Sequence, residues 1–180
     1  MARPPHARES VLDAFERLLI DEGERAATMD AAARDAGVSK GGLLYHYATK
    51  DALESALLDR LDALVGADLD AMASAPEGAV AFFLRTSVMD DDPLDRVLIA
   101  TSRLAQGGHH AAAEALRRVR TRWADALRPH VRDDTALALV LLVSDGLYYN
   151  NALGGPAAAA PVPRAGDLDA LIALVEASAR

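Results

Sequence analysis

The sequence predicts an all-α protein of about nine helices. Alanine and leucine dominate its 180 residues, only 4% of the residues are aromatic, and no segment alternates apolar and polar residues for long. Apolar residues recur at helical spacing instead, and glycine, proline and N-cap residues separate the periodic segments. We expect an N-terminal three-helix domain (residues 1–47), which a long fourth helix joins to a C-terminal helical bundle (residues 48–180).

The N-terminal half of the chain divides into four expected helices. The first covers residues 7–22, where an apolar stripe ends at Gly23. Two short helices follow at residues 28–36 and 40–47. Thr49 then caps a long helix over residues 50–74, whose leucines form a second stripe.

Proline, glycine and aspartate mark the later helix ends. Pro76 and Pro93 are each expected at a first helical position, where proline is tolerated. The remaining helices are expected at residues 93–106, 111–128, 134–153 and 167–180, with a Gly/Pro/Ala connector over residues 154–166.

Residues 28–47 have the spacing of a helix-turn-helix. Ala33 is small where two helices would cross, and Gly37 can adopt the left-handed backbone that ends the first helix. Ser39 is a suitable N-cap, and Leu43 would pack the second helix onto the first. Such a unit places its second helix in a DNA major groove, which predicts sequence-specific DNA binding.

Nine residues are candidate DNA contacts: Thr28, Ser39, Lys40, Gly41, Gly42, Leu43, Tyr45, His46 and Lys50. Base contacts are expected mainly from Lys40, Leu43 and Tyr45. Tyr45, with His46 and Lys50, better fits the role of a phosphate anchor.

Several of these assignments leave an alternative open. The two glycines either allow close approach to the groove or simply loosen the first turn. Thr28 and Thr49 either cap helices only or also hold phosphates. Arg3 and Arg8 either form a basic arm or belong to a solvated terminus, and Tyr47 is expected in the core.

Charge and composition limit the function. The net charge is −8, and residues 1–47 hold six Arg/Lys and eight Asp/Glu, which leaves −2 there and predicts modest non-specific DNA affinity. The chain has no cysteine, and the adjacent His109 and His110 cannot clamp one ion, so we expect neither a metal nor a cofactor. No catalytic constellation is present, and catalysis is not expected.

The longest apolar run, residues 136–143, is far short of the roughly 20 residues of a membrane span. With no signal peptide visible, a cytoplasmic protein is expected.

Residues 7–60 resemble the TetR family of bacterial transcriptional regulators. The resemblance rests on Gly23, Thr28, the AGVSKG run at residues 36–41 and the LLYHYATKDAL run at residues 43–53. It implies a homodimer with a three-helix DNA-binding domain and a larger helical domain for ligand binding and dimerisation. It also implies that a small molecule moves the fourth helix and draws the two recognition helices away from their half-sites.

Two residues depart from the family pattern. Leu44 stands where many relatives carry an aromatic residue, so one phosphate or sugar contact is absent. Ala32 stands where a larger apolar residue, often isoleucine, is usual, so the small domain is expected to be loosely packed there.

The C-terminal part predicts a dimer interface and a ligand pocket. The helices at residues 134–153 and 167–180 of each chain are expected to form a four-helix interface, because the first is apolar nearly all round. Arg85 and Arg103 either pair an anionic ligand or reach solvent and aspartate. Candidate pocket residues are the following: Phe82, Phe83, Met89, Trp123, Tyr148, Tyr149 and Asn150.

The predicted function is a ligand-responsive transcriptional repressor. It would bind a palindromic operator as a homodimer, with half-site centres about 34–36 Å or a multiple apart, and a small apolar effector would release it. The alternative is a helical small-molecule-binding protein whose DNA-reading unit does not function. The sequence does not separate repression from activation.

Overall fold

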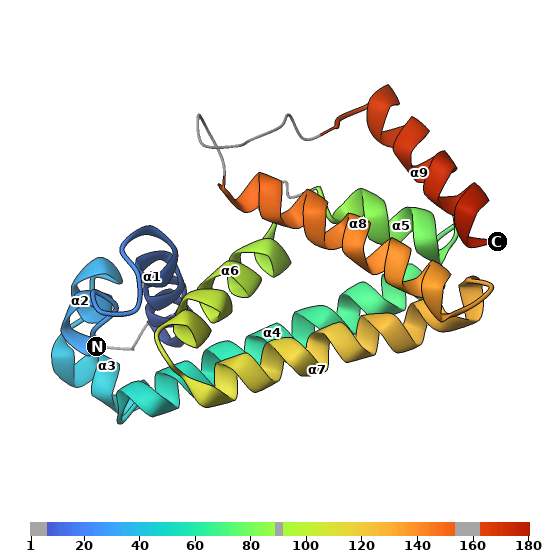
Figure 1. Ribbon diagram of the computed structural model, residues 1–180. Coiled ribbons are helices and arrows are strands. Elements are labelled where there is room, and N and C mark those ends of the chain that lie inside the picture. The colour runs from blue at the N-terminus through green and yellow to red at the C-terminus, as the bar shows by residue number, and fades with distance from the viewer. Residues whose placement is uncertain (1–6, 89–91, 154–162) are drawn as a thin grey trace. The chain divides into compact units, whose positions relative to one another are not determined.

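A computed structural model describes residues 7–88, 92–153 and 163–180. Within these ranges the chain forms nine α-helices and one short 3₁₀ helix and no strand, which confirms the all-α prediction (Figure 1). The helices are α1 (Ala7–Asp21), α2 (Met29–Asp35), α3 (Lys40–His46), α4 (Lys50–Ala73), α5 (Ala79–Thr86), α6 (Pro93–Gln106), α7 (His110–Leu127), α8 (Asp134–Leu153) and α9 (Gly166–Ala179). The 3₁₀ helix, Arg128–His130, follows α7 and contains Pro129.

One helix start differs from the prediction by more than one residue. Pro76 does not open a helix, because α5 begins three residues later at Ala79. The Gly78 amide donates to the Ala75 carbonyl at 3.1 Å, so Pro76 lies at the second position of a reverse turn, which its fixed φ also suits. Gly78 then has a φ of +91° as the N-cap of α5.

The chain folds as two compact units. The first contains α1, α2 and α3, α4 as far as Leu64, α6, and α7 as far as Arg118. The second contains α5, α8 and α9 with the remaining parts of α4 and α7. This division does not coincide with the expected boundary after residue 47, because α6 packs against α1 and joins the DNA-reading helices in one unit.

The core of the first unit forms around α1. The stripe Val11, Phe15 and Leu19 is fully buried, as are Leu43 of α3 and Leu57 of α4. The packing helix α2 presents three alanines at residues 31–33, all buried, and such small side chains allow a close helix crossing. The unit thereby holds α2 and α3 on α1.

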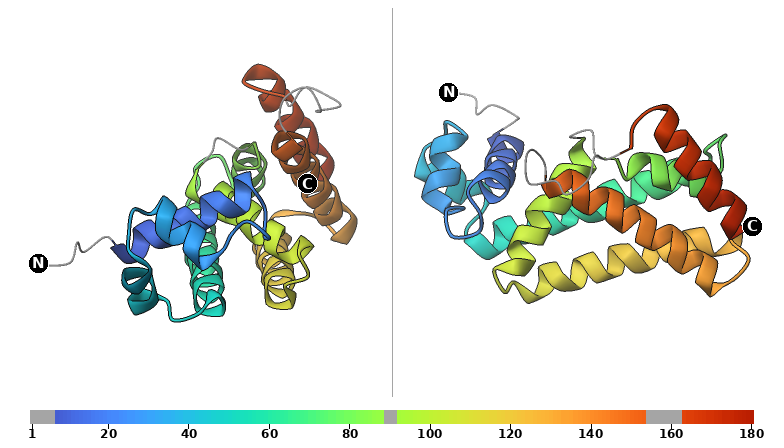
Figure 2. Two further views of the ribbon diagram at one scale, coloured as in Figure 1. Left: turned by 90° about the vertical axis from the view of Figure 1, so that its left-hand side faces the viewer. Right: turned by 45° about the horizontal axis from the view of Figure 1, so that its top comes forward.

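The core of the second unit lies among α5, α8 and α9, which pack against one another (Figure 2, green, orange and red). Phe83 and Leu84 of α5, Val140 of α8 and Ile172 of α9 are buried in one cluster. Trp123 and Leu69 are partly buried against that cluster. None of the helices in the described ranges has both the length and the apolar character needed to cross a membrane.

Candidate nucleic-acid interface

Hydroxyl caps define the helix starts of the DNA-reading unit. Thr28 Oγ1 accepts from the Ala31 amide at 3.2 Å, and Ser39 Oγ accepts from the Gly42 amide at 3.1 Å. Thr49 Oγ1 caps α4 in the same way, with the Ala52 amide at 3.1 Å. Capping uses a lone pair of the oxygen, so each hydroxyl group can still donate its hydrogen to another acceptor. Thr28, Ser39 and Thr49 are exposed, which is compatible with both capping and a phosphate contact.

A glycine ends α2 and begins the turn that leads to α3. Gly37 has a φ of +66°, which a side chain would disfavour. The Val38 amide donates to the Ala33 carbonyl at 2.9 Å, and the Gly37 amide donates to the Arg34 carbonyl at 3.2 Å. This pair of bonds is the Schellman motif. It closes α2 and sets the direction in which α3 leaves.

The outer side of α3 carries large exposed side chains. Tyr45 is 72% exposed and Leu44 is 42% exposed, and Lys40 and Gly41 are exposed beside them. Leu43 is fully buried, so its expected base contact is wrong, although it packs α3 inward as expected. The helix is only two turns long, and the next residue after the buried Leu43, Leu44, lies on its exposed side. Leu44 is therefore the apolar side chain that faces solvent here.

Tyr47 and His46 close the C-terminal end of α3. Tyr47 is 2% exposed, as expected for a core residue, and its hydroxyl donates to the Arg8 carbonyl at 3.3 Å. Burial raises the pKa of the Tyr47 phenol, against a lowering by the Arg8 guanidinium. The His46 ring lies edge-on to Tyr45 with centroids 5.1 Å apart, and its Nε2 is buried without a hydrogen-bond partner. A phosphate contact by His46 would have to use Nδ1.

Lysines of the unit are held by carboxylates of the same unit. Lys40 Nζ lies 2.9 Å from Asp30, and both side chains are 66% exposed. Lys50 Nζ lies 2.6 Å from Glu24 Oε1 and is more buried, with 31% of its side chain exposed. DNA phosphates would therefore have to replace an existing acidic partner at each lysine.

The ion pair between Lys50 and Glu24 shifts the pKa of both side chains. Burial lowers the pKa of Lys50, but the hydrogen bond and charge of Glu24 outweigh burial and raise it. The hydrogen bond from Lys50, with its charge, lowers the pKa of Glu24. Lys50 also lies 3.6 Å from Glu54, a buried carboxylate whose other oxygen is 3.2 Å from Nε2 of His109. The spacing of Lys50 and Glu54 is visible in the sequence, whereas Glu24 is 26 residues away from Lys50.

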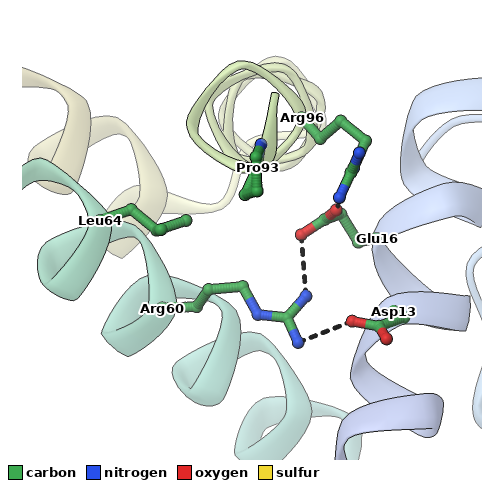
Figure 3. A pocket seen from close by; sticks show the side chains of 6 residues that line it. All are labelled: Asp13, Glu16, Arg60, Leu64, Pro93 and Arg96. Atoms are coloured by element: carbon green, nitrogen blue, oxygen red, sulfur yellow. Dashed lines mark hydrogen bonds and ion pairs between the residues drawn. The ribbon is translucent and has the colours of Figure 1, made fainter. Parts of the chain in front are cut away.

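A charged clamp holds α1 to α4 and α6. Arg60 of α4 contacts three carboxylates of α1: Glu9 at 2.8 Å, Asp13 at 2.8 Å and Glu16 at 3.0 Å. Arg96 of α6 contacts Glu16 from its other side at 3.3 Å (Figure 3). The clamp borders an open cavity of about 250 Å³, which Leu64 and Pro93 complete. Its charged lining does not suit the small apolar ligand that the sequence predicts.

The expected pocket residues are only partly brought together. Phe83 and Trp123 meet, with ring centroids 5.7 Å apart and planes tilted by 57°, and Phe82 and Tyr148 are half-buried. Tyr149 is 64% exposed, so it lines no enclosed cavity of a single chain. Asn150 uses its amide to donate to the Gly146 carbonyl of its own helix at 2.7 Å, and Met89 lies outside the described residues.

Asp68 is a candidate residue that the sequence reasoning missed. Its Oδ2 accepts a hydrogen bond from Trp123 Nε1 at 2.8 Å. Burial raises the pKa of the Asp68 carboxyl, the Trp123 bond lowers it, and the charge of Asp92 raises it further. The signal was present in the sequence, because Asp68 interrupts the apolar stripe of α4 between the buried Val65 and Met72.

Solved structures share the fold over nearly the whole chain. SCO7518 from Streptomyces coelicolor A3(2) is 26% identical, with a TM-score of 0.65 over 96% of this chain and 99% of the other. The transcriptional regulator RHA1_ro04179 from Rhodococcus sp. Rha1 is 24% identical, with a TM-score of 0.66 over 96% and 97%. The multidrug binding protein EbrR, in complex with malachite green, is 19% identical, with a TM-score of 0.62 over 98% and 99%. No curated protein sequence matches the chain.

Two family models match adjacent parts of the chain. Residues 11–57 match the model of bacterial regulatory proteins of the tetR family, which covers the caps, the Schellman turn and the exposed side of α3 described above. Residues 77–176 match the model of the tetracyclin repressor-like C-terminal domain, which alone spans more than half of the chain. The chain therefore belongs to the TetR family of transcriptional regulators, with a helix-turn-helix DNA-binding domain and a ligand-binding C-terminal domain.

Proposed function

We propose that this regulator is a repressor that binds a palindromic operator as a homodimer and leaves it when a small apolar effector binds. The exposed side of α3 carries the proposal: Leu44 and Tyr45 project from a helix that the buried Leu43 fastens to the unit. Both side chains are largely exposed in the single chain, at 42% and 72%. They would become buried when the helix enters a groove.

The proposed contacts divide into base and phosphate contacts. Lys40, Leu44 and Tyr45 would face base edges, where an ammonium donates to guanine and an apolar group meets the thymine methyl. Tyr45 can instead anchor a phosphate through its phenol, and the capping hydroxyls of Thr28 and Ser39 can do the same. Gly41 and Gly42 would allow the backbone of α3 to approach the groove closely. His46 and Lys50 would contact phosphates.

An exposed apolar surface on α8 and α9 supports the homodimer. Leu142 of α8 and Leu174 of α9 are each 65% exposed, and Tyr149 is 64% exposed. Exposed alanines at positions 170, 173 and 177 line the same stripe of α9 as Leu174. Small residues beside large apolar ones suit close helix packing, and a twofold pair of such surfaces makes a four-helix interface.

The effector is supported by the C-terminal domain and by a relative. The matched domain is of the tetracyclin repressor-like kind, and EbrR is a multidrug binding protein solved with malachite green. We place the effector in the second compact unit, near the paired rings of Phe83 and Trp123. Because α4 contributes to both units, displacement of α4 is the proposed route from effector to DNA.

Selection of bound duplexes from a random DNA pool tests the proposal, at low and at physiological salt. We expect a palindrome whose half-site centres are about 34–36 Å apart or a multiple of that distance. Tyr45→Ala then distinguishes the two roles of Tyr45: a uniform loss of affinity indicates an anchor, and an altered sequence preference indicates a reader. If no sequence is enriched at either salt concentration, the DNA-binding proposal fails.

One observation favours the alternative of a small-molecule-binding protein with a silent DNA-reading unit. Lys40 and Lys50 are both paired with carboxylates of their own unit, at 2.9 Å and 2.6 Å. A protein of this kind would bind its ligand but show no salt-dependent affinity for any duplex. The duplex selection above separates the two functions.

A further inference from the structure

Asp68 is a half-buried carboxylate without a cationic partner in the described part of the chain. Its hydrogen bond is to the indole N–H of Trp123 at 2.8 Å. By contrast, the buried Glu16 contacts two guanidinium groups, and the buried Glu54 contacts an ammonium and an imidazole. A carboxylate that is partly removed from water and lacks a counter-charge is unfavourable, and such groups cluster at functional sites.

The surroundings of Asp68 are aromatic and apolar. Its partner Trp123 is half-buried and lies beside Phe83, with ring centroids 5.7 Å apart. Leu69, next to Asp68 in the chain, and Met72, one helical turn further along α4, pack with both rings in the core of the second unit. The carboxylate therefore lies at the indole edge and at the margin of an apolar cluster. Ring faces attract cations, and tryptophan attracts them most strongly.

We propose that the second unit binds an organic cation with an apolar body, with Asp68 as the counter-charge and Trp123 and Phe83 as the aromatic wall. This inference rests on the effector-binding function proposed above and narrows its effector from an apolar molecule in general to one that also carries a positive charge. The cation forms an ion pair with Asp68, and its apolar body covers the indole ring. Asp68 keeps the Trp123 N–H satisfied with one oxygen, and the second oxygen receives the ligand.

Other ligand classes fit these residues less well. An anion would be repelled by Asp68, and a neutral apolar molecule would leave that carboxylate buried without compensation. A metal ion needs several oxygen or nitrogen ligands, and the described residues contain no group of three acidic, histidine or cysteine side chains that could hold one. A weakly hydrated organic cation, such as a quaternary ammonium or phosphonium, satisfies both the charge and the ring faces.

Isothermal titration calorimetry on the full chain tests the inference with ions of matched shape. Tetraphenylphosphonium and tetraphenylborate have the same size and opposite charge. Benzyltrimethylammonium is a smaller cation, with neopentylbenzene as its neutral counterpart. We expect each cation to bind at least about tenfold more tightly than its counterpart, since a charge-assisted contact contributes more than roughly 1.4 kcal/mol.

Asp68→Asn removes the charge and keeps an oxygen that can accept the Trp123 hydrogen bond. We expect it to weaken binding of the cations by about tenfold and to leave neopentylbenzene binding unchanged. Asp70→Asn is the matched control, because it removes an exposed charge from the same helix. Trp123, the only tryptophan, provides an independent fluorescence readout. Circular dichroism checks that both variants fold.

Each outcome bears on one proposal. Equal binding of cations and counterparts, or equal effects of Asp68→Asn and Asp70→Asn, overturns the cation site. Duplex selection on the same samples is read separately. A selected palindrome without preference for cations leaves the regulator intact and removes only this inference. Cation binding that depends on Asp68, without any selected duplex, supports the site and removes the repressor.

Discussion

At the scale of single residues, Gly41 is a glycine that the fold does not require. Its φ lies outside the left-handed range, and a Cβ would meet no atom within 4 Å. Gly41→Ala should therefore raise the free energy of unfolding by about 0.5–1 kcal/mol through helix propensity. On the proposed DNA-facing side the added methyl should lower operator affinity by about tenfold. Thermal unfolding and fluorescence anisotropy with the selected duplex measure the two effects.

Gly66→Ala provides the control for that experiment. Gly66 lies in the interior of α4, and its Cβ would make only an ordinary contact, 3.7 Å from Arg122. It should gain similar stability without any change in DNA affinity. If Gly41→Ala also leaves affinity unchanged, close approach of α3 at this position is refuted, and the glycine only loosens the first turn.

Glu16 is the buried member of the charged clamp. It is 3% exposed and contacts both Arg60 and Arg96, so Glu16→Gln leaves two guanidinium groups without their buried counter-charge. We expect the free energy of unfolding to fall by about 2–4 kcal/mol in chemical denaturation. Asp13→Asn removes a half-exposed partner of the same Arg60 and should lower that free energy by less than about 1 kcal/mol. Equal losses would show that burial of Glu16 is not what matters.

Asp68 should make stability depend on pH. Because burial raises its pKa in the folded state, the folded protein holds this proton more tightly than the unfolded chain does. The contribution of Asp68 to stability therefore falls as the pH rises from the ordinary aspartate range through the raised pKa. Asp68→Asn should be relatively more stable than the parent at neutral pH, and the two should converge in acid. Urea midpoints against pH measure this, with Asp70→Asn expected to show no such convergence.

At the scale of elements, the start of α4 is tied to the loop between α1 and α2. Lys50 is held there by Glu24 at 2.6 Å, so a phosphate must displace this carboxylate. Glu24→Gln removes the negative charge that competes with a DNA phosphate for Lys50. It should raise duplex affinity by about three- to tenfold and make that affinity depend more steeply on salt concentration. Anisotropy titrations at two salt concentrations measure both. Glu22→Gln makes the same charge change in an exposed residue nearby, and an equal effect there would indicate only long-range charge.

Helix ends and caps were predictable because their signals are local. Ser39 and Gly37 act within four residues of their own positions, and both adopt the roles that their sequence context indicates. Pro76 was misplaced because a proline suits the second position of a turn as well as a helix start. The sequence assigns Leu43 a base contact as well as its packing role, because a seven-residue helix has too few apolar positions to fix its buried face.

The ion pairs of the site could not be predicted from sequence. Arg60 contacts Glu16 across 44 residues, and Arg96 contacts the same carboxylate across 80 residues. Charged residues are frequent in this chain, at 26%, so no spacing rule selects these partners from the others. Only the tertiary packing of α4 and α6 on α1 brings these residues together. The packing of α6 on α1 also places the division into compact units elsewhere than after residue 47.

At the scale of the whole molecule, α4 belongs to both compact units. It supplies Arg60 to the clamp on α1 and, eight residues later in the chain, Asp68 to the proposed cation site. A ligand that binds Asp68 would therefore act on the helix that holds the DNA-reading unit. In the proposed release mechanism, α4 is thus the element that carries the effect of the ligand to the DNA-reading unit. Glu16→Gln, which weakens the contact of α4 with α1, should therefore reduce the effect of the ligand on DNA affinity as well as the free energy of unfolding.

The last prediction concerns the homodimer. Leu142 and Leu174 are each 65% exposed, so replacing both with glutamate costs the single chain little and places like charges within the proposed interface. We expect sedimentation analysis to change from dimer to monomer and the affinity for the palindrome to fall by at least about a hundredfold, with the helical circular dichroism spectrum retained. Leu44→Glu changes an exposed leucine of α3 in the same way. It should weaken DNA binding and leave the dimer intact. A dimer that persists in the Leu142→Glu, Leu174→Glu variant would place the interface on another surface.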